Sequence, residues 1–264
     1  MSAHASVSHE PAGPIMFVRY AFPPNYHGSC GPPDSQALFE YGASGVVDEG
    51  LRNLARQFSG AWPYLRLIAS ASGVGDPLDR RVVEAYWVGN RLLERVGVRR
   101  LADSMDERFR VLTGRQFGHL AETAIEGGVP HHSYHVLCVY PWVGLLGDDR
   151  RHEQALTVLE RCRIRWGLIR GVEPDRLLVE SQPLQFDRGR LFLGPARLET
   201  VERSLNGVGL VPEVQVGDWV SMHWEWVCDR LSPQQLASLR HYTRRHLEIV
   251  NDRLEHPGAL TALA

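Results

Sequence analysis

The sequence predicts an α+β protein in which a helical part precedes a part made of short strands. In the first half, apolar residues recur three and four positions apart, which is the spacing of one helix face. After residue 162, short runs rich in β-branched and aromatic residues are separated by turn residues, as is typical of strands. We therefore expect a flexible N-terminus (1–14), a mainly helical domain (15–155), and a small β-barrel with a C-terminal helix (156–264).

The composition is that of an ordinary globular protein. The chain of 264 residues is 44% hydrophobic and 23% charged with a formal net charge of −2, so nothing favours nucleic acid or an anionic membrane as its partner. No apolar run is long enough to span a membrane, and the N-terminus lacks the pattern of a secretory signal. The four cysteines have no paired spacing. We expect a cytoplasmic protein with reduced thiols.

The first half is expected to be a loop followed by helices. Proline and glycine are dense in residues 23–34, which predicts a loop. Helical spacing then covers residues 34–44, 46–72 and 76–97, and a shorter helix is expected over 114–128. In the third of these helices Asp76 is expected to cap the start, with Pro77 at the first helical position and Gly97 at the end.

The second half is expected to be mainly strands. Residues 130–146 are rich in aromatic and β-branched residues and predict either a strand or a buried connector, since periodicity does not separate the two. A helix over 152–161 and strands over 163–172, 176–186, 190–196 and 218–228 follow, with a turn at 187–189. Ser232 is expected to cap the final helix, with Pro233 at its first position.

His223 lies in the strand expected over 218–228. Alternation places Val220 and Met222 on one face, and Ser221 and His223 on the other. His223 therefore points away from the apolar face. Two interpretations remain open at this point: a solvated strand histidine, or a histidine that faces a metal or a partner.

Four short stretches of the second half follow a common pattern: CRIRWG (162–167), EPDRLLVES (173–181), VGDWVSMHWEWV (216–227) and RLSPQQL (230–236). This pattern resembles the HypC/HupF family, small chaperones that assemble the iron centre of [NiFe]-hydrogenases. The strongest match is VGDWV with His223 three residues further on, and the resemblance covers about residues 160–250. It implies an OB-type barrel with a C-terminal helix.

The resemblance also implies a site and partners. Cys162 and His223 would hold an Fe(CN)₂(CO) unit transiently, and the partners would be hydrogenase maturation proteins or the [NiFe]-hydrogenase large subunit. Thiolate and imidazole are suitable ligands for a first-row metal. The chain departs from the family because Cys162 is internal, because Trp166 replaces a proline, and because an insertion is expected around 196–212.

The whole chain also resembles an uncharacterised actinobacterial family associated with hydrogenase maturation. This resemblance rests on three blocks: FxRYAFPPN…CGP, AWPYL…DPLDRRVVEAYWVGN and PHHxxHV…PWVG. It implies the same role for the chain, but it implies no mechanism for the helical half.

Other residues suggest competing sites. Cys162 falls on a helical stripe with Leu156 and Leu159, so the alternative to a metal ligand is a small buried side chain. If the helix ends at residue 161, Arg161 and Arg163 would instead favour the thiolate of Cys162.

A possible second site is formed by a thiol and three clustered histidines that could bind metal or substrate: Cys30, His131, His132 and His135. The alternative for the histidines is a polar loop edge, or hydrogen-bonded histidines beneath the PWVG segment (141–144).

Three functions follow from these observations. The first is a [NiFe]-hydrogenase maturation factor with iron as transient cargo. The second is a metal-dependent or thiol enzyme in the helical half that acts in the synthesis of a metal-centre ligand. The third is an adaptor without metal, anchored to its partner by Trp166, Trp224 and Trp226. The sequence contains no phosphate-binding loop, no Gly-x-Ser-x-Gly elbow, no His-Glu-x-x-His and no paired Cys-x-x-Cys, which argues against nucleotide hydrolysis and the familiar hydrolases but does not exclude an enzyme in the helical half. We expect a chaperone or accessory protein rather than an enzyme.

Overall fold

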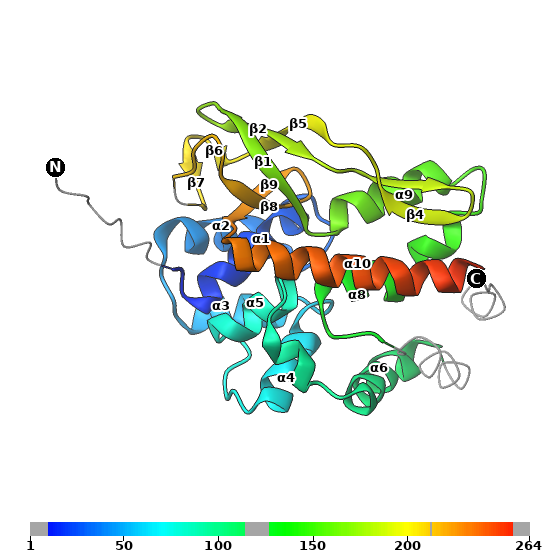
Figure 1. Cartoon of the computed structure of the whole chain (residues 1–264). Coiled ribbons are helices and arrows are strands. Elements are labelled where there is room, and N and C mark those ends of the chain that lie inside the picture. Colours follow the sequence, from blue (N-terminus) through cyan, green and yellow to red (C-terminus); the bar gives the residue numbers. More distant parts are fainter. Residues whose placement is uncertain (1–9, 114–126, 212, 256–264) are drawn as a thin grey trace.

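The computed structural model of the chain describes residues 10–113, 127–211 and 213–255, and it is an α+β structure (Figure 1). The helices before the sheet are α1 (Gly13–Tyr26), α2 (Ser35–Ser44), α3 (Glu49–Arg56), α4 (Trp62–Ser72), α5 (Arg80–Trp87), the 3₁₀-helix η1 (Arg91–Arg95) and α6 (Val98–Thr113). A connector follows, made of α8 (His132–Tyr134), the π-helix η3 (His135–Val139), the 3₁₀-helix η4 (Pro141–Leu145) and α9 (His152–Cys162). In the described part of the chain, no helix is long and apolar enough to cross a membrane.

Helix α1 is the largest departure from the expected first half. Spacing alone predicts no helix over 15–22, because every residue from Gly13 to Asn25 is buried and the run has no polar face. The helix also continues through Pro23 and Pro24 to Tyr26, so the loop predicted over 23–34 begins later than expected. The predicted flexible N-terminus lies outside the described residues up to residue 9, and its end at residues 13 and 14 already belongs to α1.

The other helical stretches are helical but more divided than expected: 46–72 contains α3 and α4, and 76–97 contains α5 and the 3₁₀-helix η1, so that Gly97 precedes α6 and does not end a long helix. Helix α5 starts three residues later than expected, because the Asp79 carboxylate caps it by accepting from the Arg81 N–H. Asp76 instead accepts from the Leu78 N–H and pairs with Arg52 at 2.9 Å. The connector over 130–146 is helical and not a strand, and its first part is buried. The helix predicted over 114–128 lies outside the described residues, apart from 127 and 128.

The strands form one closed sheet and two hairpins. Their bounds are β1 (Arg165–Val172), β2 (Arg176–Ser181), β3 (Leu184–Asp187), β4 (Arg190–Leu193), β5 (Arg197–Glu202), β6 (Ser204–Leu205), β7 (Val208–Gly209), β8 (Trp219–His223) and β9 (Trp226–Arg230). The closed sheet has the order β1-β2-β5-β9-β8, and β3–β4 and β6–β7 pair separately. Its neighbours are antiparallel except β5 and β9, which are parallel.

Three expectations for the strands need correction. The strand expected over 176–186 is divided into β2, which belongs to the closed sheet, and β3, which pairs with β4. Residues 218–228 are not one strand but the hairpin β8–β9, in which Trp224 takes a left-handed φ of 52°. Alternation could not predict this turn, because no glycine, proline or asparagine marks it. The expected insertion around 196–212 supplies β5, which is a member of the closed sheet. The predicted turn at 187–189 is present between β3 and β4, with left-handed φ at Arg188 and Gly189.

The helical part and the closed sheet share their largest hydrophobic core. This core joins residues of α1, α4 and α5 with Trp226 and Cys228 of β9 and with Leu239 and Tyr242 of α10 (Pro233–Glu255). The interior of the closed sheet has its own smaller core, which includes Val220 and Met222. Figure 1 shows α10 crossing the molecule between the strands and helices α4 to α6. The two predicted parts therefore pack into one body.

Replacement of Gly13 by alanine is expected to destabilise this packing by roughly 2 kcal/mol. A Cβ at Gly13 would lie 1.9 Å from the Leu78 carbonyl oxygen, which is backbone and cannot rotate away. The control is Gly144→Ala, because a Cβ at Gly144 meets nothing within 4 Å. Urea unfolding of both variants checks this, and equal midpoints for the two would contradict the close approach of α1 to the start of α5.

Candidate functional site

Strand β8 presses His223 against helix α1. The Nδ1–H of His223 donates to the Tyr20 carbonyl oxygen at 2.7 Å, and the Tyr20 hydroxyl lies 2.8 Å from the Ser221 hydroxyl. His223 is only 2% exposed. Ser221 and His223 do share a face opposite to Met222, as alternation predicts, but that face is covered by α1. His223 is therefore neither solvated nor open to a partner.

The prolines of α1 explain why a histidine is needed at this point. In a helix the Tyr20 carbonyl would accept from the N–H of residue 24, or of residue 23 in a tighter turn. Both positions are proline and have no N–H. A buried carbonyl without a donor costs about 1–3 kcal/mol. His223 supplies the missing donor from a strand distant in the sequence.

His132, in the connector, packs against the His223 ring. Its Nε2 donates to the Cys162 carbonyl oxygen at 2.8 Å, and its Nδ1 lies 3.1 Å from the Tyr86 hydroxyl. Its ring centroid is 4.6 Å from that of Trp87 and 5.1 Å from that of His223. The backbone of Cys162 also interacts with the His223 ring. Residues from the two predicted sites thus meet around one carbonyl group, at the end of α9.

His135 and the two thiols extend this cluster. The His135 Nδ1 lies 3.3 Å from the Tyr64 hydroxyl, and its ring centroid is 4.6 Å from that of Tyr140. Cys30 and Cys162 are half-buried and close enough to each other and to Tyr140 to interact electrostatically. His135 opens the π-helix η3, a rare element that is often found at functional sites. We call His132, His135, His223, Cys30 and Cys162 the histidine–thiol cluster.

His131 does not join this cluster. Its Nδ1 lies 2.7 Å from the Ser133 hydroxyl, which in turn lies 2.7 Å from the Nδ1 of His246 on α10. Its ring stacks on Tyr242, with centroids 5.2 Å apart. Of the two alternatives to a binding site, the polar loop edge is wrong, because His131, His132 and His135 are buried, and all three have hydrogen-bonding contacts. The first of them fastens the connector to α10.

Burial keeps these side chains uncharged. It lowers the pKa of His131 to about 3 and that of His223 to about 4, and it lowers the pKa of His132 well below the usual range. Burial also raises the pKa of the Cys30 and Cys162 thiols to about 12. At neutral pH the imidazoles of His132 and His223 are therefore neutral, and the thiols of Cys30 and Cys162 are protonated.

A Cys162 thiolate favoured by neighbouring arginines is expected only if the helix ends before Cys162, and this condition is not met. Helix α9 includes Cys162. Its neighbour Arg161 pairs with Glu225 at 2.8 Å, and Arg163 pairs with Glu160 at 2.7 Å. The guanidinium groups are thus held by carboxylates, and the C-terminal end of a helix does not stabilise an anion. Burial dominates the thiol pKa.

The cluster does not fit a resident metal ion. Among the residues that the structure describes, no three His, Cys, Asp or Glu side chains are grouped so that they could hold a metal. Of the pair implied by the resemblance, His223 uses Nδ1 on the Tyr20 carbonyl and packs its ring against Trp87 and His132. Cys162 holds its proton. A metal between them would have to displace packed aromatic rings.

The three tryptophans predicted as partner anchors are buried within the chain. Trp166, Trp224 and Trp226 are between 4% and 8% exposed. Trp226 packs edge-on against Phe22, with centroids 5.3 Å apart, and Trp224 stacks on His27 at 5.2 Å. Their surfaces are therefore used in packing and are not free for a partner in this conformation.

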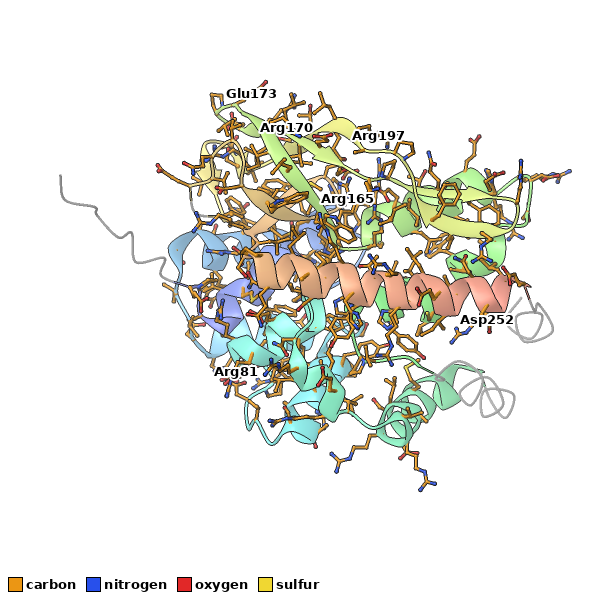
Figure 2. All side chains as sticks on the ribbon, in the orientation of Figure 1. Arg81, Arg165, Arg170, Glu173, Arg197 and Asp252 are labelled. Carbon is orange, nitrogen blue, oxygen red and sulfur yellow. The ribbon has the colours of Figure 1, made fainter. Side chains whose placement is uncertain are left out.

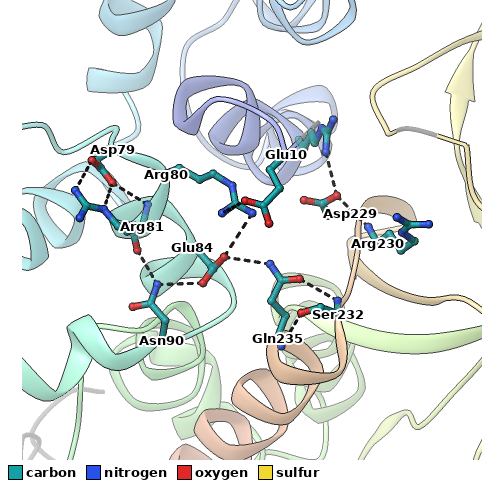
Figure 3. A network of polar contacts seen from close by, with 11 residues as sticks. Glu10, Asp79, Arg80, Arg81, Glu84, Asn90, Asp229, Arg230, Ser232 and Gln235 are labelled. Carbon is teal, nitrogen blue, oxygen red and sulfur yellow. Dashed lines mark hydrogen bonds and ion pairs between the residues drawn. The ribbon is translucent and has the colours of Figure 1, made fainter. Parts of the chain in front are cut away.

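Sequence reasoning missed a polar network between α5, α10 and the end of β9 (Figure 3). Glu84 accepts from the Gln235 side-chain amide at 3.1 Å, and Arg19 pairs with the largely buried Asp229 at 3.0 Å. Ser232 and Gln235 also cap the start of α10 reciprocally. This capping box, Ser-x-x-Gln before an apolar run, is the one signal in the sequence that points to the network.

Comparison with known proteins gives a family for the chain and no activity. A family model matches residues 9–257, and its description is a family of unknown function, DUF6390. No curated protein and no solved structure matches the chain significantly. The match spans nearly the whole sequence, so helices and closed sheet together are the unit of the family. The chain belongs to DUF6390, a family of unknown function.

Proposed function

We propose that the chain is an accessory protein of [NiFe]-hydrogenase maturation that docks to a maturation protein or to the hydrogenase large subunit. The observation that carries the proposal is the strand order of the closed sheet together with the helix that follows it. Counted along the chain, the five barrel strands lie in the order 1-2-3-5-4, with the 3–5 pair parallel. That order is the one of OB-type Greek-key barrels, the type implied by the resemblance to the HypC/HupF family.

The VGDWV motif supports the same proposal through its role in the barrel. Gly217 has a left-handed φ of 94°, which glycine adopts readily, and the Asp218 carboxylate accepts from the Gln215 N–H at 3.0 Å. Ile169 of β1 exchanges two 3.0 Å backbone hydrogen bonds with this turn. The residues of the VGDWV motif thus attach the start of β8 to β1. Their role in this chain is to build the barrel, and this supports the resemblance at the level of the fold.

The geometry favours docking over iron carriage or enzymatic chemistry. Iron carriage would use Cys162 and His223, but the thiol is protonated and the histidine is inaccessible. A thiol enzyme built on Cys30 meets the same difficulty, because its raised pKa leaves little nucleophilic thiolate at neutral pH. Neither objection applies to a protein that acts by binding another protein.

The test is an anaerobic pull-down of the tagged full-length chain from the organism that encodes it, with mass spectrometry and infrared spectroscopy of the eluate. We expect hydrogenase maturation proteins or the large subunit to co-purify, and the Cys162→Ser variant to retain them. CN and CO stretching bands that disappear in Cys162→Ser would instead establish iron carriage. Repeated eluates without any hydrogenase protein would overturn the proposed function.

A further inference from the structure

A groove of about 450 Å³ lies between α10 and the β3–β4 hairpin, away from the histidine–thiol cluster. Its walls combine apolar side chains with two arginines: Trp166, Phe192, Leu193, Leu247, Arg240 and Arg244. A volume of this size is typical of sites for small molecules. Phe192 remains 40% exposed, which is unusual for a phenylalanine beside a packed helix.

The groove is held open by a specific contact between its two walls. The Asn251 side chain of α10 accepts from the Leu191 N–H at 2.8 Å and donates to the Leu191 carbonyl at 2.9 Å. This pairing fastens β4 to the helix as a neighbouring strand would. The distance between the walls is thus set by hydrogen bonds within the chain, and the groove is formed before any ligand arrives.

Its two arginines are available to an anion. They stand one helical turn apart on α10 and both line the groove. The Arg240 guanidinium lies 4.8 Å from the Trp219 ring centroid and 5.9 Å from that of Trp166, so aromatic faces position it and leave its N–H edges free. Among the described residues, no carboxylate forms an ion pair with Arg240 or Arg244; Glu248 lines the groove one turn further on and is exposed.

A second groove of similar volume shows the contrast. It lies between α9 and the strands and contains Arg161 and Arg165. There Arg161 pairs with Glu225, and Arg165 pairs with Glu199. Its positive charge is already neutralised. Other charged side chains, such as Arg170 and Glu173, lie on the far side of the barrel from α10 (Figure 2).

We propose that the groove beside α10 binds a small amphipathic anion, an organic acid with an apolar body. Its carboxylate lies between Arg240 and Arg244, where bidentate, charge-assisted hydrogen bonds form, and its apolar part covers Phe192 and Leu247. The proposal is independent of any role in hydrogenase maturation, because it rests on the groove alone.

Calorimetry of the full-length protein with octanoate, and with octanamide as its neutral counterpart, tests the proposal. We expect octanoate to bind with a Kd of about 0.1–1 mM, as a ligand of this size allows, and octanamide to bind roughly tenfold more weakly. Arg244→Gln should weaken octanoate roughly tenfold and leave octanamide unchanged, because it removes one charge-assisted contact from an exposed position. Arg170→Gln, on the far side of the barrel, is the matched control.

Phe192→Ser provides a second line of evidence, since it should weaken both ligands without changing the preference for the anion. Equal affinity for octanoate and octanamide would overturn the proposal. An Arg244→Gln variant that binds octanoate as the wild type does, or a wild type that binds neither compound at millimolar concentration, would also overturn it.

Discussion

The protein is expected to lose most of its stability between pH 6.5 and pH 5. Four histidines are buried and uncharged in the folded state: His131, His132, His223 and His246. Burial lowers the pKa of each, to about 3 for His131 and about 4 for His223. In the unfolded chain these side chains regain the ordinary pKa of about 6.5.

The sign of the effect follows from proton binding. Above pH 6.5 a histidine is neutral in both states, so stability does not depend on it. Below pH 6.5 only the unfolded chain takes up the proton, which favours unfolding by about 1.4 kcal/mol per pH unit for each histidine. At pH 5 His131 and His223 together account for about 4 kcal/mol, against a total stability of about 5–15 kcal/mol. The raised pKa of Asp229, caused by its burial, acts in the opposite direction.

Urea unfolding followed by circular dichroism at pH 8, 7, 6 and 5 measures this dependence. The urea concentration at the unfolding midpoint should be the same at pH 8 and pH 7 and should fall steeply below pH 6.5. His246→Gln should make the free energy of unfolding fall less steeply with decreasing pH, because one buried histidine is removed. His241→Gln, which changes an exposed residue of the same helix, is the control. A midpoint that is constant down to pH 5 would show that the four histidines are not buried as described.

Replacement of His223 by alanine is expected to destabilise the fold by about 3 kcal/mol. The change leaves a cavity and removes the donor to the Tyr20 carbonyl, which Pro23 and Pro24 cannot replace. Pro24→Ala restores a backbone N–H at the position that serves this carbonyl in a helix. We therefore expect Pro24→Ala to recover about 1 kcal/mol when His223 is absent.

A double-mutant cycle on the free energy of unfolding separates this role from others. The pair is coupled if Pro24→Ala destabilises the wild type but stabilises the His223→Ala variant. If Pro24→Ala has the same effect in both backgrounds, the histidine does not act through the Tyr20 carbonyl. Retention of hydrogenase partners by the rescued double variant would further separate the structural role of His223 from the proposed function.

Local signals predicted those parts of the fold that depend on neighbours in the sequence. Ser232 caps α10 as expected, and the turn at 187–189 joins two strands. The errors arose where distant contacts override a local rule. Prolines normally end a helix, but α1 continues through Pro23 and Pro24 because a strand provides a donor. The β8–β9 turn uses a tryptophan in a conformation that glycine or asparagine usually adopts.

For the candidate site, the sequence supplied the residue types and could not supply their surroundings. Alternation correctly placed His223 opposite Met222, but it could not show that α1 covers that face. Likewise the spacing of His131 and His132 does not show that one faces α10 and the other faces the end of α9. Accessibility of a side chain is a property of the elements packed on it, and those elements lie elsewhere in the chain.

The bond between Tyr20 and His223 also constrains the order in which the chain can be completed. The last turn of the first helix requires a donor that lies 203 residues further along the chain. During synthesis, α1 leaves the ribosome well before β8 exists, so its buried carbonyl stays solvated until the second-to-last strand has been made. Helix α1, the earliest helix in the described part of the chain, can thus reach its final form only after β8 has been made.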